Sequence, residues 1–341
     1  MNLETRISIL SELGKSLDKR DLKYTKACDD AYNANNWFTH GNIEIAIEAI
    51  KKYFLEENKL QRWTDDYTII KDNKSEKNVG LIMAGNIPLV GFHDLISVFV
   101  SGHIALLKLS SRDEVLMKYI LDLIFDIEPE ARKYLIVTDR INYSDAVIAT
   151  GSNNTYRYFE YYFRNIPTLL RKNRNGAALI LGDETKNELK ELAFDIQSYF
   201  GLGCRNVSKL YVPETYDFSH FIEILDENEE LKNHNKYRNN FDYNLAVSLI
   251  NKERFMQGEN VLLFEDIRYL SRIATLHYEY YSAPDIINAR LRNDRDDIQV
   301  FTSSKGNFSG LDFEVRFGQT QVPGLLDYAD GVDTINFLTN L

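Results

Sequence analysis

The feature that most constrains the fold is a regular alternation of short apolar runs with helical stretches, which begins at Val79. Short apolar runs are typical of buried strands, and the longer periodic stretches between them are typical of helices. A strand, a helix and a second strand form a right-handed crossover, which makes the two strands parallel. The pattern predicts a doubly wound α/β domain, with strands at 79–84, 104–109, 134–138 and 146–150 and helices at 89–100, 114–125 and 155–163.

A second alternation predicts another α/β lobe, with the join between the lobes near 171–176. Its expected strands are 177–181, 209–212, 245–250, 260–264 and 298–302, and its expected helices are 186–199 and 218–231. The Asn-rich stretch 233–240 is interpreted as a polar loop. Ahead of both lobes, residues 1–62 have apolar side chains at helical spacing and no strand signal, so we expect an all-helical N-terminal layer.

The composition of the chain narrows the kinds of function that it can have. The 341 residues are 44% hydrophobic and 27% charged, which suits a globular protein with a large core. The net charge of −11 repels polyanions and disfavours nucleic acid as a partner. Only two cysteines, Cys28 and Cys204, are present, so a reducing cytoplasm is expected. Residues 1–20 mix charged and apolar residues and lack the apolar core of a signal peptide, so secretion is not expected, and the apolar stretch 89–109 is too polar to predict a membrane span.

Cys204 is the candidate nucleophile. It follows a Gly-Leu-Gly bend, precedes Arg205 and stands before an expected strand, so we expect it at a loop tip between a helix and a strand. Glycines permit close backbone approach, and a neighbouring cation favours the thiolate. The alternative is a buried, inert thiol, because free cysteine often packs as a small hydrophobe.

Asn86 and Lys108 each follow an expected strand of the first lobe. Ligands of doubly wound sheets bind beyond the carboxyl ends of the strands, so the two side chains could share one crevice. The alternatives are a turn role for Asn86 and a solvated strand-end role for Lys108.

Four motifs resemble those of the aldehyde dehydrogenase superfamily, in the same order and with similar spacing. They are Gly-Asn-Ile-Pro at 85–88, Ser-Gly at 101–102 with Lys-Leu-Ser-Ser at 108–111, Ala-Thr-Gly-Ser at 149–152, and Gly-Leu-Gly-Cys at 201–204. More closely, the chain resembles the LuxC-type acyl-CoA reductases, which segments 317–324 and 327–331 also support. The similarity covers roughly residue 78 to the C-terminus.

The resemblance implies an aldehyde dehydrogenase-like α/β fold with two doubly wound lobes. It also implies a helical N-terminal layer at 1–75, a Rossmann-like nucleotide-binding domain at 76–175, a catalytic domain at 176–316 and a closing C-terminal segment at 317–341. Cys204 would attack the carbonyl, and Asn86 would form an oxyanion hole with the Cys204 N–H. Lys108 would bind the adenosine ribose, while Gly151 and Ser152 would face the pyrophosphate.

The chain departs from the superfamily pattern at the hydrolytic glutamate. Oxidising members carry a Glu-Leu-Gly-Gly motif before the second lobe, whereas this chain reads Leu-Arg-Lys-Asn-Arg-Asn-Gly at 170–176. Without that base, water attack on an acyl-enzyme is poorly assisted, which favours reduction of a thioester. Together with this departure, the resemblance to the LuxC-type reductases implies an enzyme that reduces a fatty acyl-CoA to an aldehyde.

Ser111 and Arg112 stand where many NAD-preferring relatives carry a glutamate after the ribose lysine. A carboxylate there repels a 2′-phosphate, whereas serine and arginine could hold one, so NADPH is the expected cofactor. The alternative is a helix-capping serine beside a solvated arginine.

Other interpretations stay open at the level of sequence. A cysteine acyltransferase or thioesterase would keep Cys204 and Asn86 without a nicotinamide, and a catalytically silent subunit would use the fold for interaction alone. An acyl-donating partner protein and a homo-oligomer are both possible. Segment 277–281 could line an acyl tunnel or pack the second lobe. Four basic residues could meet coenzyme A phosphates or form a solvated edge: Arg164, Arg171, Lys172 and Arg174.

Overall fold

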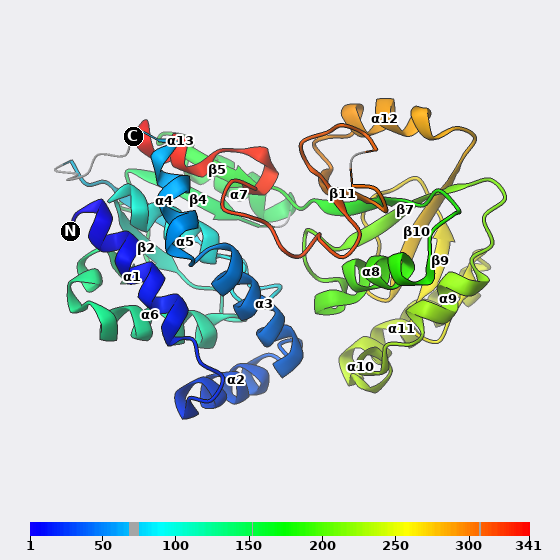
Figure 1. The fold of residues 1–341 in the computed structure, drawn as a ribbon, viewed down its shortest axis with the longest axis horizontal. Coiled ribbons are helices and arrows are strands. Elements are labelled where there is room, and N and C mark those ends of the chain that lie inside the picture. Colours follow the sequence, from blue (N-terminus) through cyan, green and yellow to red (C-terminus); the bar gives the residue numbers. More distant parts are fainter. Residues whose placement is uncertain (68–74, 152, 307) are drawn as a thin grey trace. The chain divides into compact units, whose positions relative to one another are not determined.

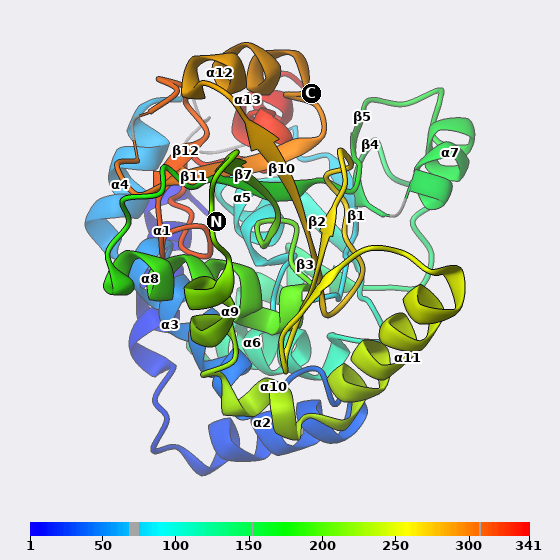
Figure 2. The same ribbon diagram turned by 90° about the vertical axis from the view of Figure 1, so that its right-hand side faces the viewer.

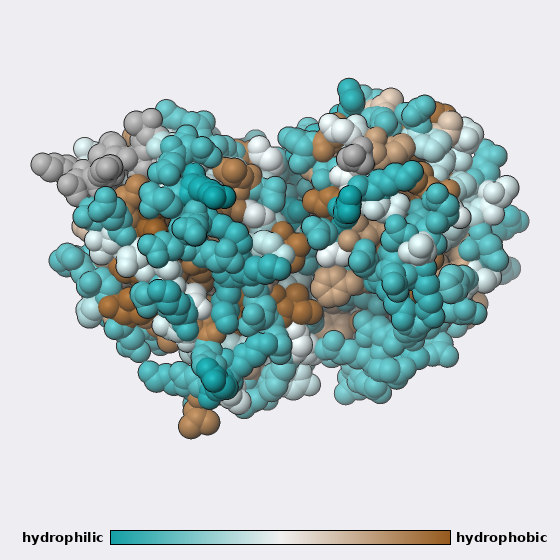
Figure 3. Space-filling view, in the orientation of Figure 1, coloured by the Kyte–Doolittle hydropathy of each residue, from teal (hydrophilic) through white to brown (hydrophobic). Residues whose placement is uncertain are grey.

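The computed structural model describes residues 1–67, 75–151, 153–306 and 308–341. The chain divides into two compact units. The first contains residues 1–173 and 323–341, and the second contains residues 174–322. Hydrophilic residues dominate the visible surface of both units, and apolar residues appear there in small groups (Figure 3). Among the described residues, no helix is long and apolar enough to cross a membrane.

The N-terminal layer of the first unit is helical, as predicted. It consists of α1 (Leu3–Ser16), α2 (Leu22–Ala34), α3 (His40–Tyr53) and α4 (Glu57–Asp65). Three of these helices begin at a residue whose side chain accepts a hydrogen bond from the first turn, namely Asn2, Asp21 and Thr39. Their apolar faces join the core of the first unit, where Leu10, Leu13 and Ile43 are fully buried.

The first unit also holds a five-stranded parallel sheet in the order β3-β2-β1-β4-β5. The strands are β1 (Asn78–Ile82), β2 (Ile104–Lys108), β3 (Leu135–Val137), β4 (Ala146–Thr150) and β5 (Thr168–Arg171). They alternate with α5 (Phe92–Ser101), α6 (Glu114–Ile127), the 3₁₀ turn η1 (Pro129–Lys133) and α7 (Asn153–Tyr162). The chain runs outward from β1 to β3 and then returns to the other side of β1. This is the predicted doubly wound topology, with its switch point between β1 and β4.

The C-terminal residues 323–341 belong to the first unit and include η3 (Ala329–Gly331) and α13 (Thr334–Thr339). Helix α13 packs beside α5 (Figure 1). Arg171, at the end of β5, forms a buried ion pair with Asp94 of α5 and donates to the Thr334 hydroxyl over 2.9 Å. These contacts link β5, α5 and α13, and breaking such a buried pair would leave an uncompensated charge.

The second unit is built on a seven-stranded sheet in the order β12-β11-β6-β7-β10-β9-β8. Its strands are β6 (Asn175–Leu179), β7 (Val207–Pro213), β8 (Met256–Gln257), β9 (Leu262–Glu265), β10 (Thr275–Tyr281), β11 (Ile298–Ser303) and β12 (Glu314–Arg316). All neighbouring pairs are parallel except β8 and β9. This sheet is the second α/β lobe that the sequence predicted.

Helices cover both faces of the second sheet (Figures 1 and 2). On one face, α8 (Lys186–Gln197) and α9 (Ser219–Leu225) pack on a cluster that includes Ala178 and Leu210. On the other face, α12 (Pro284–Asn293) packs on a cluster that includes Ala177 and Tyr211. Neighbouring residues of one strand join different clusters because successive strand side chains point to opposite faces.

The strand predicted at 245–250 and the loop predicted at 233–240 are both wrong. The chain there forms α10 (Glu229–Asn233) and α11 (Asn235–Asn251). In α11, Tyr237, Phe241, Asn244 and Ser248 are buried at helical spacing, whereas Leu249 and Ile250 are 62% and 78% exposed. A short apolar run cannot be assigned to a strand or a helix by periodicity alone, and here the run ends a helix.

Candidate active site

Three candidate residues lie at one edge of the first sheet. β1 pairs with β2 and β4, and Ile82 is in register with Lys108 on one side and Ala149 on the other. Asn86, Lys108 and Gly151 therefore stand at or just beyond the carboxyl ends of three adjacent strands. The predicted edge location of Asn86 and Lys108 is confirmed, and the switch point between β1 and β4 is where doubly wound folds bind ligands.

The loop after β1 lies directly against the loop after β2. A Cβ atom at Gly85 would come within 2.4 Å of Ser110 Oγ and 3.2 Å of Arg112 Cβ, so only glycine allows this approach. The carboxyl group of Asp113 accepts a hydrogen bond of 2.8 Å from Leu89 N, which fastens the two loops together. Leu89 has a φ of 56°, a left-handed conformation. Asn86 is thus held in a closely packed bend.

The cofactor residues predicted on β2 and after it are exposed. The side chains of Lys108, Ser111 and Arg112 all face solvent. The main-chain oxygen of Arg112 accepts a hydrogen bond of 3.2 Å from the amide of buried Asn35. The backbone is therefore fixed while the guanidinium stays accessible, an arrangement that fits an anionic ligand.

Gly151 follows β4 and precedes α7. A Cβ atom there would lie 3.0 Å from Thr155 Cβ and 3.2 Å from Phe159 Cε2, which is tight packing at the strand–helix turn. Backbone N–H groups at such a turn suit a phosphate. Ser152, predicted to share this role, lies outside the described residues.

The two cysteines differ in environment. Cys28 lies in α2, is 5% exposed, and burial raises the pKa of its thiol. Cys204 is half-buried and stands between the 3₁₀ turn η2 (Ser198–Gly201) and β7. The predicted loop position of Cys204 is therefore confirmed, and Cys204 is the more exposed residue of the pair.

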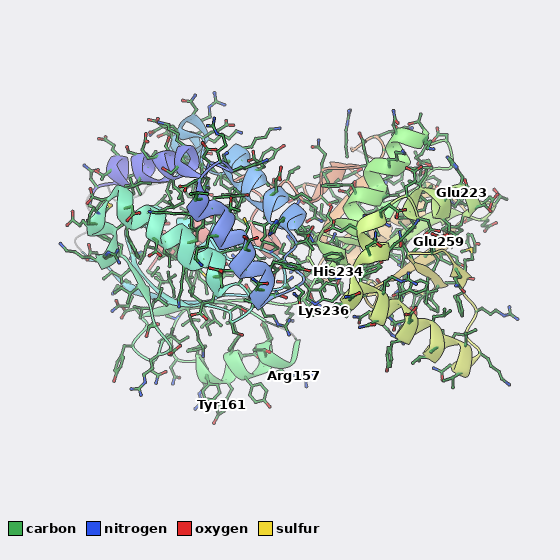
Figure 4. The ribbon with its side chains drawn as sticks, turned by 90° about the horizontal axis from the view of Figure 1, so that it is seen from below. Arg157, Tyr161, Glu223, His234, Lys236 and Glu259 are labelled. Atoms are coloured by element: carbon green, nitrogen blue, oxygen red, sulfur yellow. The ribbon has the colours of Figure 1, made fainter. Side chains whose placement is uncertain are left out.

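The bend before Cys204 has an unusual backbone. Tyr199, Phe200 and Gly201 are consecutive left-handed residues, with φ values of 53°, 59° and 73°. This conformation costs about 1–2 kcal/mol at each non-glycine residue, so surrounding contacts must impose it. One such contact is the ring of Phe200 on that of His234, with centroids 4.2 Å apart. His234, labelled in Figure 4, caps the start of α11.

A second set of contacts comes from Asn206, which is 1% exposed. Its Oδ1 accepts a hydrogen bond of 2.8 Å from Gly203 N. Its Nδ2 donates to the carbonyl oxygens of Asp195 and Ser198 over 3.0 and 2.8 Å. The side chain thus joins the end of α8 to the residue directly before Cys204.

Asp195 and Arg205 extend these contacts to residues 318–320. The carboxylate of Asp195 accepts from Gly318 N over 2.7 Å, and from the N–H and hydroxyl of Thr320 over 3.1 and 2.8 Å. Arg205 Nε donates to the Thr320 carbonyl oxygen. Burial raises the pKa of Asp195 to about 6, against these hydrogen bonds and the charge of Arg205. Sequence reasoning placed Arg205 beside the thiol but missed its bond to Thr320, along with Asp195 and Asn206.

The basic residues considered for coenzyme A phosphates are largely engaged. Arg171 is buried in its ion pair, and the Arg174 side chain is 11% exposed and donates to the Arg295 carbonyl oxygen over 3.3 Å. Lys172 and Arg164 lie over tyrosine rings of the α7 region, and Figure 4 shows Tyr161 pointing away from that helix. Of the four basic residues considered for coenzyme A phosphates, two therefore remain as candidates, Lys172 and Arg164.

The aromatic segment 277–281 lies on β10 and packs the second unit. Tyr281 donates to the Ile180 carbonyl oxygen over 2.8 Å, and a ring nitrogen of His277 is hydrogen-bonded to the Arg268 carbonyl oxygen over 2.9 Å. These contacts favour the packing interpretation over an acyl tunnel.

No protein-family model matches the chain, and no curated protein matches it. Solved structures do match. Aldehyde dehydrogenase 21 from Physcomitrella patens, in complex with the product succinate, aligns with a TM-score of 0.70 at 12% identity, over 100% of this chain and 84% of that one. A Mycobacterium tuberculosis aldehyde dehydrogenase complexed with NAD⁺ aligns with a TM-score of 0.63 at 13% identity, over 89% and 73%.

A third match is a cysteine-to-alanine mutant of aldehyde dehydrogenase C from Pseudomonas syringae, complexed with NAD⁺ and octanal. It aligns with a TM-score of 0.61 at 12% identity, over 89% of this chain and 72% of that one. At such low identity the likeness shows the fold. The chain has an aldehyde dehydrogenase-like α/β fold, as predicted.

Proposed function

We propose that this protein reduces a fatty acyl thioester, with acyl-CoA as donor and NADPH as reductant, to an aldehyde through an acyl-enzyme on Cys204. The observation that carries the proposal is the placement of Cys204, half-buried at a strained and clamped bend before β7, within an aldehyde dehydrogenase-like fold. Strained backbone persists where surrounding structure imposes it, and it concentrates at functional sites.

The roles assigned to the chain's own residues are those that the resemblance to the aldehyde dehydrogenase superfamily implies. The Cys204 thiolate attacks the thioester carbonyl carbon, and the Asn86 amide and Cys204 N–H donate to the oxygen as it becomes negative. The bond from that carbon to the coenzyme A sulfur then breaks. Coenzyme A leaves as a thiolate that takes up a proton, and the acyl group stays on Cys204. When bound, the reduced nicotinamide would supply a hydride to the acyl carbon; the bond from that carbon to the Cys204 sulfur would then break, which releases the aldehyde and restores the Cys204 thiolate.

The first unit offers residues that fit the cofactor. Lys108 is assigned to the adenosine ribose, Ser111 and Arg112 to the 2′-phosphate, and Gly151 to the pyrophosphate. Their fit is supported by the shared carboxyl edge of β2, β1 and β4, by the exposed guanidinium of Arg112 and by the tight glycine turn after β4. Ser152 keeps its pyrophosphate assignment from the sequence alone.

Reduction is favoured over oxidation because a hydrolytic carboxylate is missing from its expected place. Residues 168–179, which form β5, β6 and their connection, contain no aspartate or glutamate. The basic residue at the end of β5, Arg171, is committed to Asp94. Hydrolysis of an acyl group on Cys204 would therefore be slow, so that the acyl-enzyme persists until it is reduced by hydride.

The test is to incubate the protein with acyl-CoA, with and without NADPH, and to follow aldehyde release and intact mass. We expect one added acyl group without NADPH and aldehyde with it. Cys204→Ala should abolish both, and Cys28→Ala, the matched control, should change neither. Aldehyde formation by Cys204→Ala at the wild-type rate, or an acyl group on Cys28, would overturn the proposal. Acyl transfer without any aldehyde would favour the acyltransferase alternative.

A further inference from the structure

The amide of Asn206 is the group that connects both sides of the bend before Cys204. Its single acceptor takes Gly203 N–H, and its donors reach the carbonyl oxygens of Asp195 and Ser198. A third carbonyl oxygen, that of Ile196, lies 3.4 Å from Nδ2. One N–H partner and three carbonyl partners fix the orientation of the amide, because the reverse orientation would face donor to donor and acceptor to acceptor. The left-handed residues Tyr199 and Phe200 lie inside the segment that it spans.

The contacts of Asn206 continue to the residues on both sides of Cys204. Asn206 binds the main chain of Asp195, the Asp195 carboxylate binds Thr320, and Thr320 accepts from Arg205. Cys204 stands between Gly203, held by Asn206, and Arg205, held by Thr320. Of the two neighbours of the candidate nucleophile, Gly203 is held by the buried side chain of Asn206, and Arg205 by the main-chain oxygen of buried Thr320.

We infer that Asn206 is a positioning residue for the Cys204 nucleophile: it imposes the left-handed bend and so sets the place of the thiol and of the Cys204 N–H. The inference rests on the proposed function, in which Cys204 attacks a thioester. Asn206 itself touches no reacting atom. Its effect should appear in the rate of acyl transfer rather than in cofactor binding, because the assigned cofactor residues belong to the first unit.

Asn206→Asp is the sharpest substitution. It keeps an oxygen for Gly203 N–H but places a second oxygen against the Asp195 and Ser198 carbonyl oxygens, where a donor is needed. Asn260→Asp is a matched control in the same unit. Asn260 is fully buried and likewise donates from Nδ2 to two carbonyl oxygens, those of Leu225 and Asn228, over 3.1 and 3.0 Å.

In the acyl-CoA assay, we expect Asn206→Asp to lower kcat at least tenfold while the KM for NADPH stays within twofold of wild type. Asn260→Asp should lower the melting temperature to a similar degree but leave kcat within threefold. If Asn206→Asp does not fold, Asn206→Ser, which introduces no charge, should show the same split between kcat and KM. A folded Asn206 variant with wild-type kcat, or an equal loss in Asn260→Asp, would overturn the inference.

A separate readout distinguishes this inference from the proposed function. Alkylation of Cys204 by iodoacetamide, followed by mass spectrometry in Cys28→Ala protein, needs no thioester chemistry. We expect the Asn206 variants to change this rate at least threefold and Asn260→Asp to leave it unchanged. If the wild type makes no aldehyde, the proposed function fails while alkylation still reports on Asn206. Unchanged alkylation in folded Asn206 variants would sink the positioning role whatever the reaction.

Discussion

Two loops that carry candidate site residues are each fastened by a buried carboxyl group, one in each unit. In the first unit, Asp113 holds the loop of Asn86 through a single bond from Leu89 N, and among the described residues no donor meets its other oxygen. In the second unit, Asp195 holds residues 318–320 beside the Cys204 bend through three donors. Both loops are thus held by a buried carboxyl group, but Asp113 accepts one hydrogen bond and Asp195 accepts three.

The difference shows in the charge that each group carries. Burial raises the pKa of Asp113 well above its usual value, with only the Leu89 bond opposing it. Burial also raises the pKa of Asp195, but three hydrogen bonds and Arg205 keep it at about 6. Burial therefore biases Asp113 towards the neutral acid, whereas Asp195, with a pKa of about 6, is mainly ionised at neutral pH and depends on its donors. Substitutions in the two loops should show whether the two carboxyl groups differ in charge in this way.

The largest effect is expected from Asn86, the residue that the first loop presents. Asn86→Ala removes a donor aimed at charge that develops in the transition state, so turnover should fall roughly 10²–10³-fold, or about 2.7–4 kcal/mol. NADPH affinity, measured by fluorescence titration, should hardly change. Unaltered turnover would mean that Asn86 acts only as a turn residue and that the first loop has a structural role alone.

Asp195→Asn should change the pH dependence of stability. The folded pKa of about 6 exceeds the ordinary value of 3.8, so the protonated form is favoured by folding. That contribution is fully present below pH 3.8 and is lost as the pH rises through 6. The unfolding free energy of wild type minus that of Asp195→Asn should therefore fall by about 2–3 kcal/mol between pH 4 and pH 7.5. Urea unfolding at several pH values measures it; a flat difference would contradict the assignment.

Asp113→Asn is the counterpart that tests the contrast. The amide resembles the neutral acid and keeps an oxygen for Leu89 N–H, so near neutral pH the unfolding free energy should change by less than about 1 kcal/mol. The same urea titrations give the result. A difference between wild type and Asp113→Asn that changes with pH near neutrality, as expected for Asp195→Asn, would mean that Asp113 is charged there and that the two carboxyl groups behave alike.

Arg112 tests the cofactor edge beside the first loop. Arg112→Ala should weaken NADPH binding by about 1.5–3 kcal/mol, the range for hydrogen bonds to charged groups, and barely affect NADH. Lys118→Ala, which removes an exposed cation from α6, is the matched control and should leave both affinities unchanged. Equal losses for the two nucleotides would rule out a 2′-phosphate site at Arg112.

The fold could be predicted largely because strand and helix alternate with clear periodicity. The strand at 146–150 matches β4, and the helix at 114–125 matches most of α6. The strand β5 was missed because its four residues end in Arg171 and are followed by Lys172, and the tertiary contacts with Asp94 and Thr334 explain a buried arginine there. From sequence alone, a charged residue at the end of a short apolar run indicates the end of an element. Its burial can be inferred only when its ion-pair partner is known.

The site could be predicted as far as single motifs allow. Glycine spacing located Cys204 and Asn86, but the contacts that hold them come from residues far away in sequence, such as Thr320 against Asp195. Asn206 lies only two residues after Cys204, and a polar residue at the start of a buried strand was a usable signal. The role of Asn206, however, depends on its bonds to the carbonyl oxygens of Asp195 and Ser198 at the end of α8. No local sequence pattern predicts where that helix end lies relative to Asn206.

The smallest effect tests the region where sequence reasoning went wrong. Ile250 was expected in a buried strand, yet it lies at the end of α11 and is 78% exposed. Ile250→Gln should therefore change the unfolding free energy by no more than about 0.5 kcal/mol, as at other exposed sites. Phe241→Ala, on the buried side of the same helix, should cost about 3–5 kcal/mol in the same urea titration. Similar losses for the two variants would restore the buried-strand interpretation, because a half-exposed helix cannot bury both positions.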